Sequence, residues 1–220
     1  ANMKVGNRLS LGFGVLVALL LIILAMGINR LGMLNDGLTE VVGDRWPKAV
    51  LANEVLDHIN GIAINLRNMA LADNREELHE QKERILEQRR KIGENLESLK
   101  KVINLPKGKE MLQAIFDTRA KYITGQERYI KLVEEGKLDE ARAYLNSEVR
   151  PILPTYTEQI RGFVKFQGEL MESSAKAAGE MYATAKTLMI LLGLVAAILS
   201  VAIGALITRS LLKQLGGEPD

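Results

Sequence analysis

Apolar and charged positions are sharply segregated along this chain of 220 residues. The runs 9–29 and 187–208 contain no charged side chain, whereas charges are frequent throughout the segment between them. A helix rises about 1.5 Å per residue, so each run would span roughly 30 Å, the thickness of the hydrocarbon core of a bilayer. The pattern therefore predicts two transmembrane helices that flank one soluble domain.

The first apolar run has a second interpretation, a signal peptide that is cleaved. Ala25 and Gly27 are small residues of the kind found at cleavage sites. The run is longer than the roughly 7–15 apolar residues typical of a signal peptide, however, and its helical pattern continues without a break. A retained transmembrane helix is the favoured interpretation.

Positive charges flank both runs, at Lys4, Arg8, Arg209 and Lys213. Short positive flanks stay in the cytoplasm, while long loops are translocated largely regardless of their charge. We therefore expect residues 1–8 and 209–220 to be cytoplasmic. Residues 30–186 would lie outside, which in a bacterium is the periplasmic side of the inner membrane.

The spacing of apolar residues predicts that the soluble domain is helical. In the segment 75–103, apolar residues recur every seven positions, at Leu78, Ile85, Ile92 and Leu99. Asn74 is suited to cap this helix, because Glu77 follows three residues later. Turn signals separate four long helices and one short one, expected at about 48–73, 75–103, 109–135, 150–186 and 138–145. The predicted fold class is all-α, with an up-down-up-down four-helix bundle between the two spans.

Pro47, in the sequence DRWPKAV, interrupts the helical pattern between the first span and the bundle. Proline removes a backbone donor and clashes with the preceding turn, so a continuing helix should break or kink near Gly43–Trp46. Alternatively, Pro47 is the first residue of the next helix, and Trp46 anchors the chain at the membrane interface. The second interpretation is favoured.

Charge and residue types exclude several classes of function. The 29 basic residues are interleaved with 27 acidic ones, which is typical of solvated helix faces and not of a nucleic-acid-binding patch. The chain has no cysteine, no glycine-rich phosphate loop and no clustered metal ligands. His58 and His79 lie on different predicted helices, as surface histidines do. We expect no catalytic site, no metal and no cofactor.

Polar residues occupy positions on the apolar stripes of two helices. Arg119, Tyr122 and Gln126 lie on the stripe of the third helix, and Gln88 lies on that of the second, next to Arg89. A buried guanidinium needs an anion nearby. Arg119 could extend outward to solvent, pair with Asp57 or Glu158, or await a dissolved anion; for a single arginine the first two are favoured.

Counting residues from the outer end of each helix places these side chains at similar heights. Asn60 on the first helix falls at the same level, so the six polar residues could converge on one layer inside the bundle. Two guanidiniums, amides and a phenol suit a carboxylate, because arginine binds carboxylates through two parallel hydrogen bonds.

Several stretches, in this order and spacing, resemble a methyl-accepting chemotaxis receptor with a four-helix-bundle ligand-binding domain: LRNMALADN, TRAKY, EEGKLDEARAYLNSEVRP and LLKQLGGEPD. The resemblance covers essentially the whole chain and implies a homodimer. It identifies ITRSLLKQLGGEPD as the start of a HAMP linker. Partner proteins in the cytoplasm, a kinase and an adaptor, would be reached only through a C-terminal part that this chain lacks.

The resemblance also implies two binding modes. Receptors that bind organic acids inside the bundle have an arginine and a tyrosine three apart, as Arg119 and Tyr122 are in TRAKY, and Gln126 stands where some have another arginine. Receptors for amino acids bind between two subunits through three arginines of the first helix. Here Arg67 matches the last of the three, whereas Ala63 and His58 occupy the other positions.

The function expected from the sequence is therefore that of a chemoreceptor sensory module that binds a small anionic ligand, such as a di- or tricarboxylate. The expected ligand-binding residues are Arg119, Tyr122, Gln126, Arg89, Gln88 and Asn60, with Arg67 in the alternative site. The same module could instead head a histidine kinase or a nucleotide cyclase. A structural helical membrane protein without a ligand is the third interpretation.

Overall fold

The structure, a computed structural model, describes residues 5–215, which are helical except for short turns. Residues 1–4 and 216–220, parts of the two expected cytoplasmic segments, lie outside the described residues. The chain divides into two compact units: Glu40–Ser173, and the two apolar ends of the chain together.

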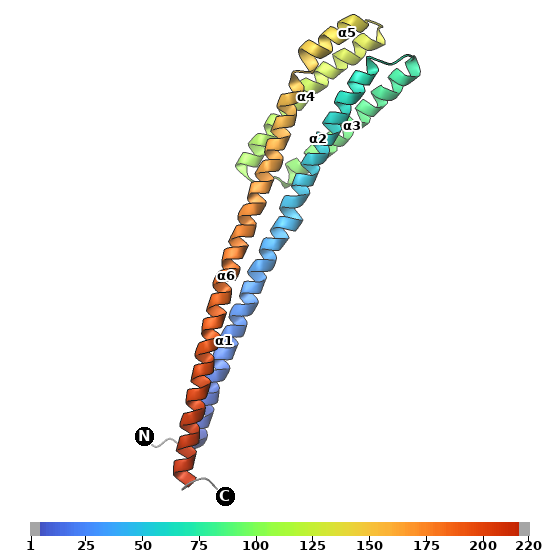
Figure 1. The fold of residues 1–220 in the computed structure, drawn as a ribbon. Coiled ribbons are helices and arrows are strands. Elements are labelled where there is room, and N and C mark those ends of the chain that lie inside the picture. The colour runs from blue at the N-terminus through green and yellow to red at the C-terminus, as the bar shows by residue number, and fades with distance from the viewer. Residues whose placement is uncertain (1–4, 216–220) are drawn as a thin grey trace. The chain divides into compact units, whose positions relative to one another are not determined.

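The unit Glu40–Ser173 is a four-helix bundle, and the predicted all-α fold is confirmed (Figure 1). Its helices are α2 (Trp46–Met69), α3 (Arg75–Val102), α4 (Pro106–Glu134) and the first part of α6 (Ile152–Leu215), with a short α5 (Leu138–Tyr144) between the last two. One hydrophobic core unites the four long helices through fully buried side chains such as Ile59, Ile85, Ile115, Tyr129 and Phe163.

The ends of the helices follow the local sequence. Asn74 caps α3 as predicted, since its Oδ1 accepts a hydrogen bond of 2.9 Å from the Glu77 N–H. Helix α4 begins at Pro106, three residues earlier than expected, because proline fits the first helical turn, where no N–H donor is needed. Helix α2 ends at Met69, short of the expected Asp73.

Two π-helical turns precede the proline-containing starts of α2 and α6. The turn η1 (Val41–Arg45) joins α1 to α2, and η2 (Leu145–Val149) leads from α5 toward α6. The N–H of the residue before each proline closes the turn: Trp46 donates to the Val41 oxygen, and Arg150 donates to the Leu145 oxygen. A wider turn relieves the clash between a proline ring and the carbonyl four residues earlier.

The expectation of a break near Gly43–Trp46 is therefore wrong, because the backbone stays helical through a π turn, and a kink at this turn stays a prediction. Pro47 does lie in the first turn of α2, as the favoured interpretation predicted. The role of Trp46 as a membrane anchor stays a prediction.

The second unit contains α1 (Val5–Glu40) up to Thr39 and the C-terminal part of α6. Gly12 allows these helices to approach closely, because a Cβ atom there would come within 2.7 Å of Ile203. Most of the large apolar side chains point outward; Leu11 is 62% exposed and Val201 is 74% exposed. By length and composition, both helices could cross a membrane.

Candidate ligand-binding site

Arg89 is held inside the bundle by groups of α4. Its Nε donates to Gln126 Oε1 over 2.5 Å, and its Nη2 donates to the main-chain oxygen of Ile123 over 3.4 Å. The exposed Glu127 carboxylate lies 3.5 Å from its Nη1. Burial lowers the pKa of the Arg89 guanidinium, and Glu127 counteracts this effect. Arg89 therefore cross-links α3 and α4.

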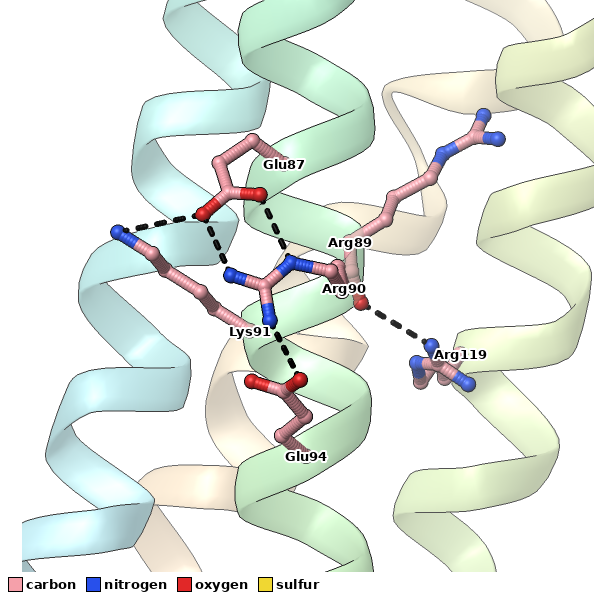
Figure 2. A network of polar contacts seen from close by, with 6 residues as sticks. All are labelled: Glu87, Arg89, Arg90, Lys91, Glu94 and Arg119. Carbon is pink, nitrogen blue, oxygen red and sulfur yellow. Dashed lines mark hydrogen bonds and ion pairs between the residues drawn. The ribbon is translucent and has the colours of Figure 1, made fainter.

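Arg119 reaches back from α4 to the same turn of α3. Its Nη2 donates to the main-chain oxygen of Arg89 over 3.2 Å, as the dashed line in Figure 2 shows. Gly93 makes room for it, because a Cβ atom at Gly93 would lie 3.0 Å from that nitrogen. Within residues 5–215 no ion pair of Arg119 with Asp57 or Glu158 forms, so the internal pairing partner is a carbonyl dipole and not a carboxylate.

The surface beside Arg119 is rich in paired charges. Arg90 lies between Glu87 and Glu94 on the exposed face of α3, and Lys91 also reaches Glu87 (Figure 2). The hydrogen bond from Arg90 lowers the pKa of Glu87 to about 2. The open trough next to Arg119 is lined partly by Glu94 and Glu97. Arg89, Arg90 and Lys101 line the same trough, so basic residues outnumber the two carboxylates there.

Tyr122 and Gln126 lie in the core, as expected. Tyr122 is 3% exposed and packs edge-to-face against Tyr156, with the ring centroids 5.8 Å apart. Burial raises the pKa of both phenols. Among the described residues, Gln126 Nε2 and the Tyr156 hydroxyl have no hydrogen-bond partner. Arg89, Arg119, Tyr122 and Gln126 form the inner layer of the bundle. This inner layer thus contains buried polar atoms that lack some of their hydrogen bonds.

Gln88 pairs with an asparagine that the sequence analysis did not single out. Asn65, which is 6% exposed, donates from Nδ2 to Gln88 Oε1 over 3.1 Å. Gly61 gives Gln88 its space, because a Cβ atom there would overlap the Gln88 amide. Asn65 follows Ile62 by three residues and so shares the buried face of α2, which is the signal that could have identified it.

The expected place of Asn60 in this layer is wrong. Its side chain is exposed, whereas its neighbour Ile59 is fully buried. Height along a helix does not determine which way a side chain points, and adjacent residues differ in direction by about 100°. Of the six side chains expected to meet, Arg89 contacts Gln126 and Arg119 reaches the Arg89 main chain, whereas Gln88 pairs with Asn65 of α2, Tyr122 packs against Tyr156 of α6, and Asn60 is exposed.

A hollow of about 260 Å³ opens where α2 faces η2 and the start of α6. Arg67 and Arg150 line it from opposite elements, and the buried Tyr122 also contributes to its wall. The remaining lining residues are Ala63, Leu66, Leu145, Asn146, Val149 and Leu153. None of these described residues is acidic, and none of the hydrogen bonds or ion pairs among residues 5–215 engages either guanidinium.

The hollow suits a small organic anion. Two guanidiniums and the Asn146 amide supply donors, while Leu66, Val149 and Leu153 offer apolar surface to a short carbon skeleton. Sequence reasoning placed Tyr122 in a site inside the bundle and Arg67 in a different site between subunits, and it did not single out Asn146 and Arg150. Both lie in NSEVRP, where η2 packs against α4: a Cβ atom at Gly125 would lie 3.2 Å from Val149. No group of three or more metal-ligating side chains occurs among the described residues.

Comparison with known proteins agrees with the fold. The model of the four-helix-bundle sensory module for signal transduction matches residues 2–182. The chain is 26% identical over 133 residues to a protein of Acetivibrio thermocellus named "Putative sensory transducer protein"; the match covers 57% of this chain and 24% of the relative. The chain thus corresponds to about a quarter of that relative's length. No solved structure matches significantly.

Proposed function

The chain belongs to the family of four-helix-bundle sensory modules for signal transduction, and we propose that it is the part of a transmembrane chemoreceptor that senses a small carboxylate. The observation that carries this proposal is the hollow between α2 and the start of α6, in which Arg67 and Arg150 have no protein partner among the described residues. A carboxylate there would receive charge-assisted hydrogen bonds from both sides.

The hollow is a better ligand site than the inner layer around Arg89 and Arg119. Both of those guanidiniums already donate to Gln126 or to main-chain oxygens, so a ligand would first have to displace these contacts. Tyr122 belongs to both regions, because it lines the hollow and lies one turn before Gln126. We assign the inner layer a supporting role behind the ligand.

Helix α6 offers a direct route for the signal. Leu153 lines the hollow in the first turn of α6, and the same helix continues without interruption to Leu215, beyond the apolar run. A ligand that draws η2 and Leu153 toward α2 would change the strain at the start of this helix. Relief of this strain would shift α6 slightly along its axis or rotate it about that axis, and packed helices transmit movements of this kind.

Membrane placement completes the proposal. The apolar segments of α1 and α6 would span the inner membrane, with the bundle in the periplasm and the ends of the chain in the cytoplasm. A homodimer would set two α2 helices near its axis, and the hollow would then lie near the partner subunit. The output would pass to a HAMP linker and, through a part beyond this chain, to the kinase that controls chemotaxis.

The test is binding to the whole chain in lipid nanodiscs. A thermal-shift screen with malate, succinate, citrate and amino acids should identify a ligand that raises the melting temperature. Arg67→Ala and Arg150→Ala should each weaken its binding by about 1 kcal/mol, because both guanidiniums are exposed, measured by calorimetry. The matched control is Arg161→Ala, an exposed arginine of α6 outside the hollow, which should bind like the unaltered chain.

Two results would contradict this assignment. If no acid in the screen shifts the melting temperature, the module does not sense small carboxylates of this kind. If a ligand binds and only Arg119→Ala removes it, the inner layer is the site and the hollow is not.

A further inference from the structure

The floor of the hollow between α2 and the start of α6 is largely apolar. Its least exposed lining side chains are each at most 3% exposed: Leu66, Tyr122 and Val149. Half-buried apolar side chains surround this floor: Ala63, Leu145 and Leu153. Apolar surface of a ligand would leave water here, and each buried methylene group strengthens binding about fourfold. The carbon skeleton of the ligand therefore determines much of its affinity.

The charged groups of the hollow lie at its rim. Arg67, Asn146 and Arg150 line it and are exposed, in contrast to the floor. An exposed guanidinium adds only modestly to binding, because water already solvates it before the ligand arrives. A carboxylate at the rim therefore orients the ligand, with its carbon skeleton directed toward the floor.

Two common kinds of acid match this arrangement poorly. The ammonium group of an amino acid would lie near two guanidiniums, and no described residue that lines the hollow is acidic. A second carboxylate would be buried against the floor without a partner, which is costly, or would stay at the rim and leave the floor uncovered. Both mismatches favour an acid with a single charge.

We propose, resting on the function proposed above, that the hollow selects a monocarboxylate with a compact apolar body, branched or aromatic, and without an ammonium group. The carboxylate accepts from Arg67 and Arg150, and the body covers Leu66, Val149 and Leu153. The 260 Å³ of the hollow equals roughly nine water molecules at their liquid volume, so a ligand of about eight to ten non-hydrogen atoms fills it. 4-Methylpentanoate and phenylacetate have this size.

The experiment compares acids that differ in one group. 4-Methylpentanoate is leucine without its ammonium group, and 2-methylpentanedioate carries a carboxylate in place of one of its methyl groups. Each acid is titrated calorimetrically into the whole chain in nanodiscs, and empty nanodiscs measure how much of the acid enters the lipid. 4-Methylpentanoate should bind at least about tenfold more tightly than either of the other two, because neither the ammonium nor the second carboxylate finds a partner.

Two further probes separate the floor from the rim. Along the unbranched acids from propanoate to hexanoate, affinity should rise about fourfold for each added methylene group. 4-Methylpentanamide keeps the apolar body but lacks the charge, and it should bind about tenfold more weakly than 4-methylpentanoate. These comparisons use the unaltered chain, so they do not depend on the folding of a variant.

Variants assign the two parts of the ligand to the hollow. Leu153→Ala should weaken 4-methylpentanoate about fivefold and leave succinate unchanged. The matched control is Ile152→Ala, since Ile152 is the neighbouring half-buried residue in the same turn of α6 and does not line the hollow. Arg67→Ala should weaken every acid about fivefold and leave 4-methylpentanamide unchanged.

The outcomes distinguish this selection from the proposed function. If leucine or 2-methylpentanedioate binds as tightly as 4-methylpentanoate and Arg67→Ala weakens it, the hollow senses carboxylates but the selection for an apolar body is wrong. Equal affinities from propanoate to hexanoate would overturn the selection in the same way. If 4-methylpentanamide binds as tightly as 4-methylpentanoate, the hollow does not sense the carboxylate and the proposed function fails. Absence of binding by every acid would reject both.

Discussion

The bundle contains two pairs of arginines that differ in how they are satisfied. Arg89 and Arg119 lie between α3 and α4, half-buried, and donate to protein oxygens. Arg67 and Arg150 are exposed at the hollow and have no partner among the described residues. The difference teaches that an arginine on a helix stripe can be structural because it is buried, while a more exposed arginine can keep its donors unpaired with protein groups.

The strongest test of this difference is the stability of the ligand-free chain. Arg89→Ala leaves Gln126 Oε1 buried without its donor, so the free energy of unfolding of the bundle should fall by about 1–3 kcal/mol. Arg67→Ala removes no hydrogen bond or ion pair among the described residues and should stay within about 0.5 kcal/mol of the unaltered chain. Urea unfolding followed by circular dichroism measures both. Equal losses would show that the two pairs do not differ in kind.

A double-mutant cycle sharpens the account of the inner layer. Gly61→Ala alone should gain little stability, because the new methyl group pushes Gln88 away from Asn65. In a Gln88→Ala background the same change should stabilise α2 by about 1 kcal/mol, the ordinary advantage of alanine over glycine in a helix. The coupling between the two sites is therefore about 1 kcal/mol. If the effects of the two substitutions on stability are additive, Gln88 accommodates the new methyl group with no loss of free energy.

The smallest expected effect concerns Arg90, the exposed neighbour of Arg89. Arg90 holds the pKa of Glu87 at about 2, so this carboxylate favours folding above its ordinary pKa of 4.5. That contribution should be lost as the pH falls through about 2. Because both groups are solvent-exposed, salt should weaken the effect. An NMR titration of Glu87 should show its pKa returning toward 4.5 in Arg90→Ala; an unchanged pKa would rule out the pairing.

The fold could be predicted from the sequence because its signals are local. The seven-residue spacing of Leu78, Ile85, Ile92 and Leu99 follows from helix geometry alone, and α3 packs by these residues. The cap at Asn74 depends on residues three apart. The π geometry of the two turns could not be predicted. Pro47 indicates an irregularity in the helix, but several backbone geometries avoid its clash with the carbonyl four residues earlier.

The candidate site was predictable only in part because it depends on how segments meet. The sequence assigned Tyr122 to a site inside the bundle and Arg67 to another between subunits, and the structure places both at the hollow. Asn146 and Arg150 were missed, since their direction is set by η2, which packs against α4 and α5. Asn60 failed for a related reason: a difference of one position along α2 separates the core from solvent, and residue counts cannot resolve it.

The π turn at Val41–Arg45 affects how this module could be joined to other receptors. A π turn accommodates one residue more than an uninterrupted α-helix, and one residue rotates a helix face by about 100°. Chimeras whose junction lies before Val41 therefore inherit this offset, whereas chimeras joined after Arg45 do not. If a chimera of each kind transmits the signal, the linkers of the two should differ in length by one residue. A chimera without this adjustment should turn the wrong face of its helix toward the helices it packs against.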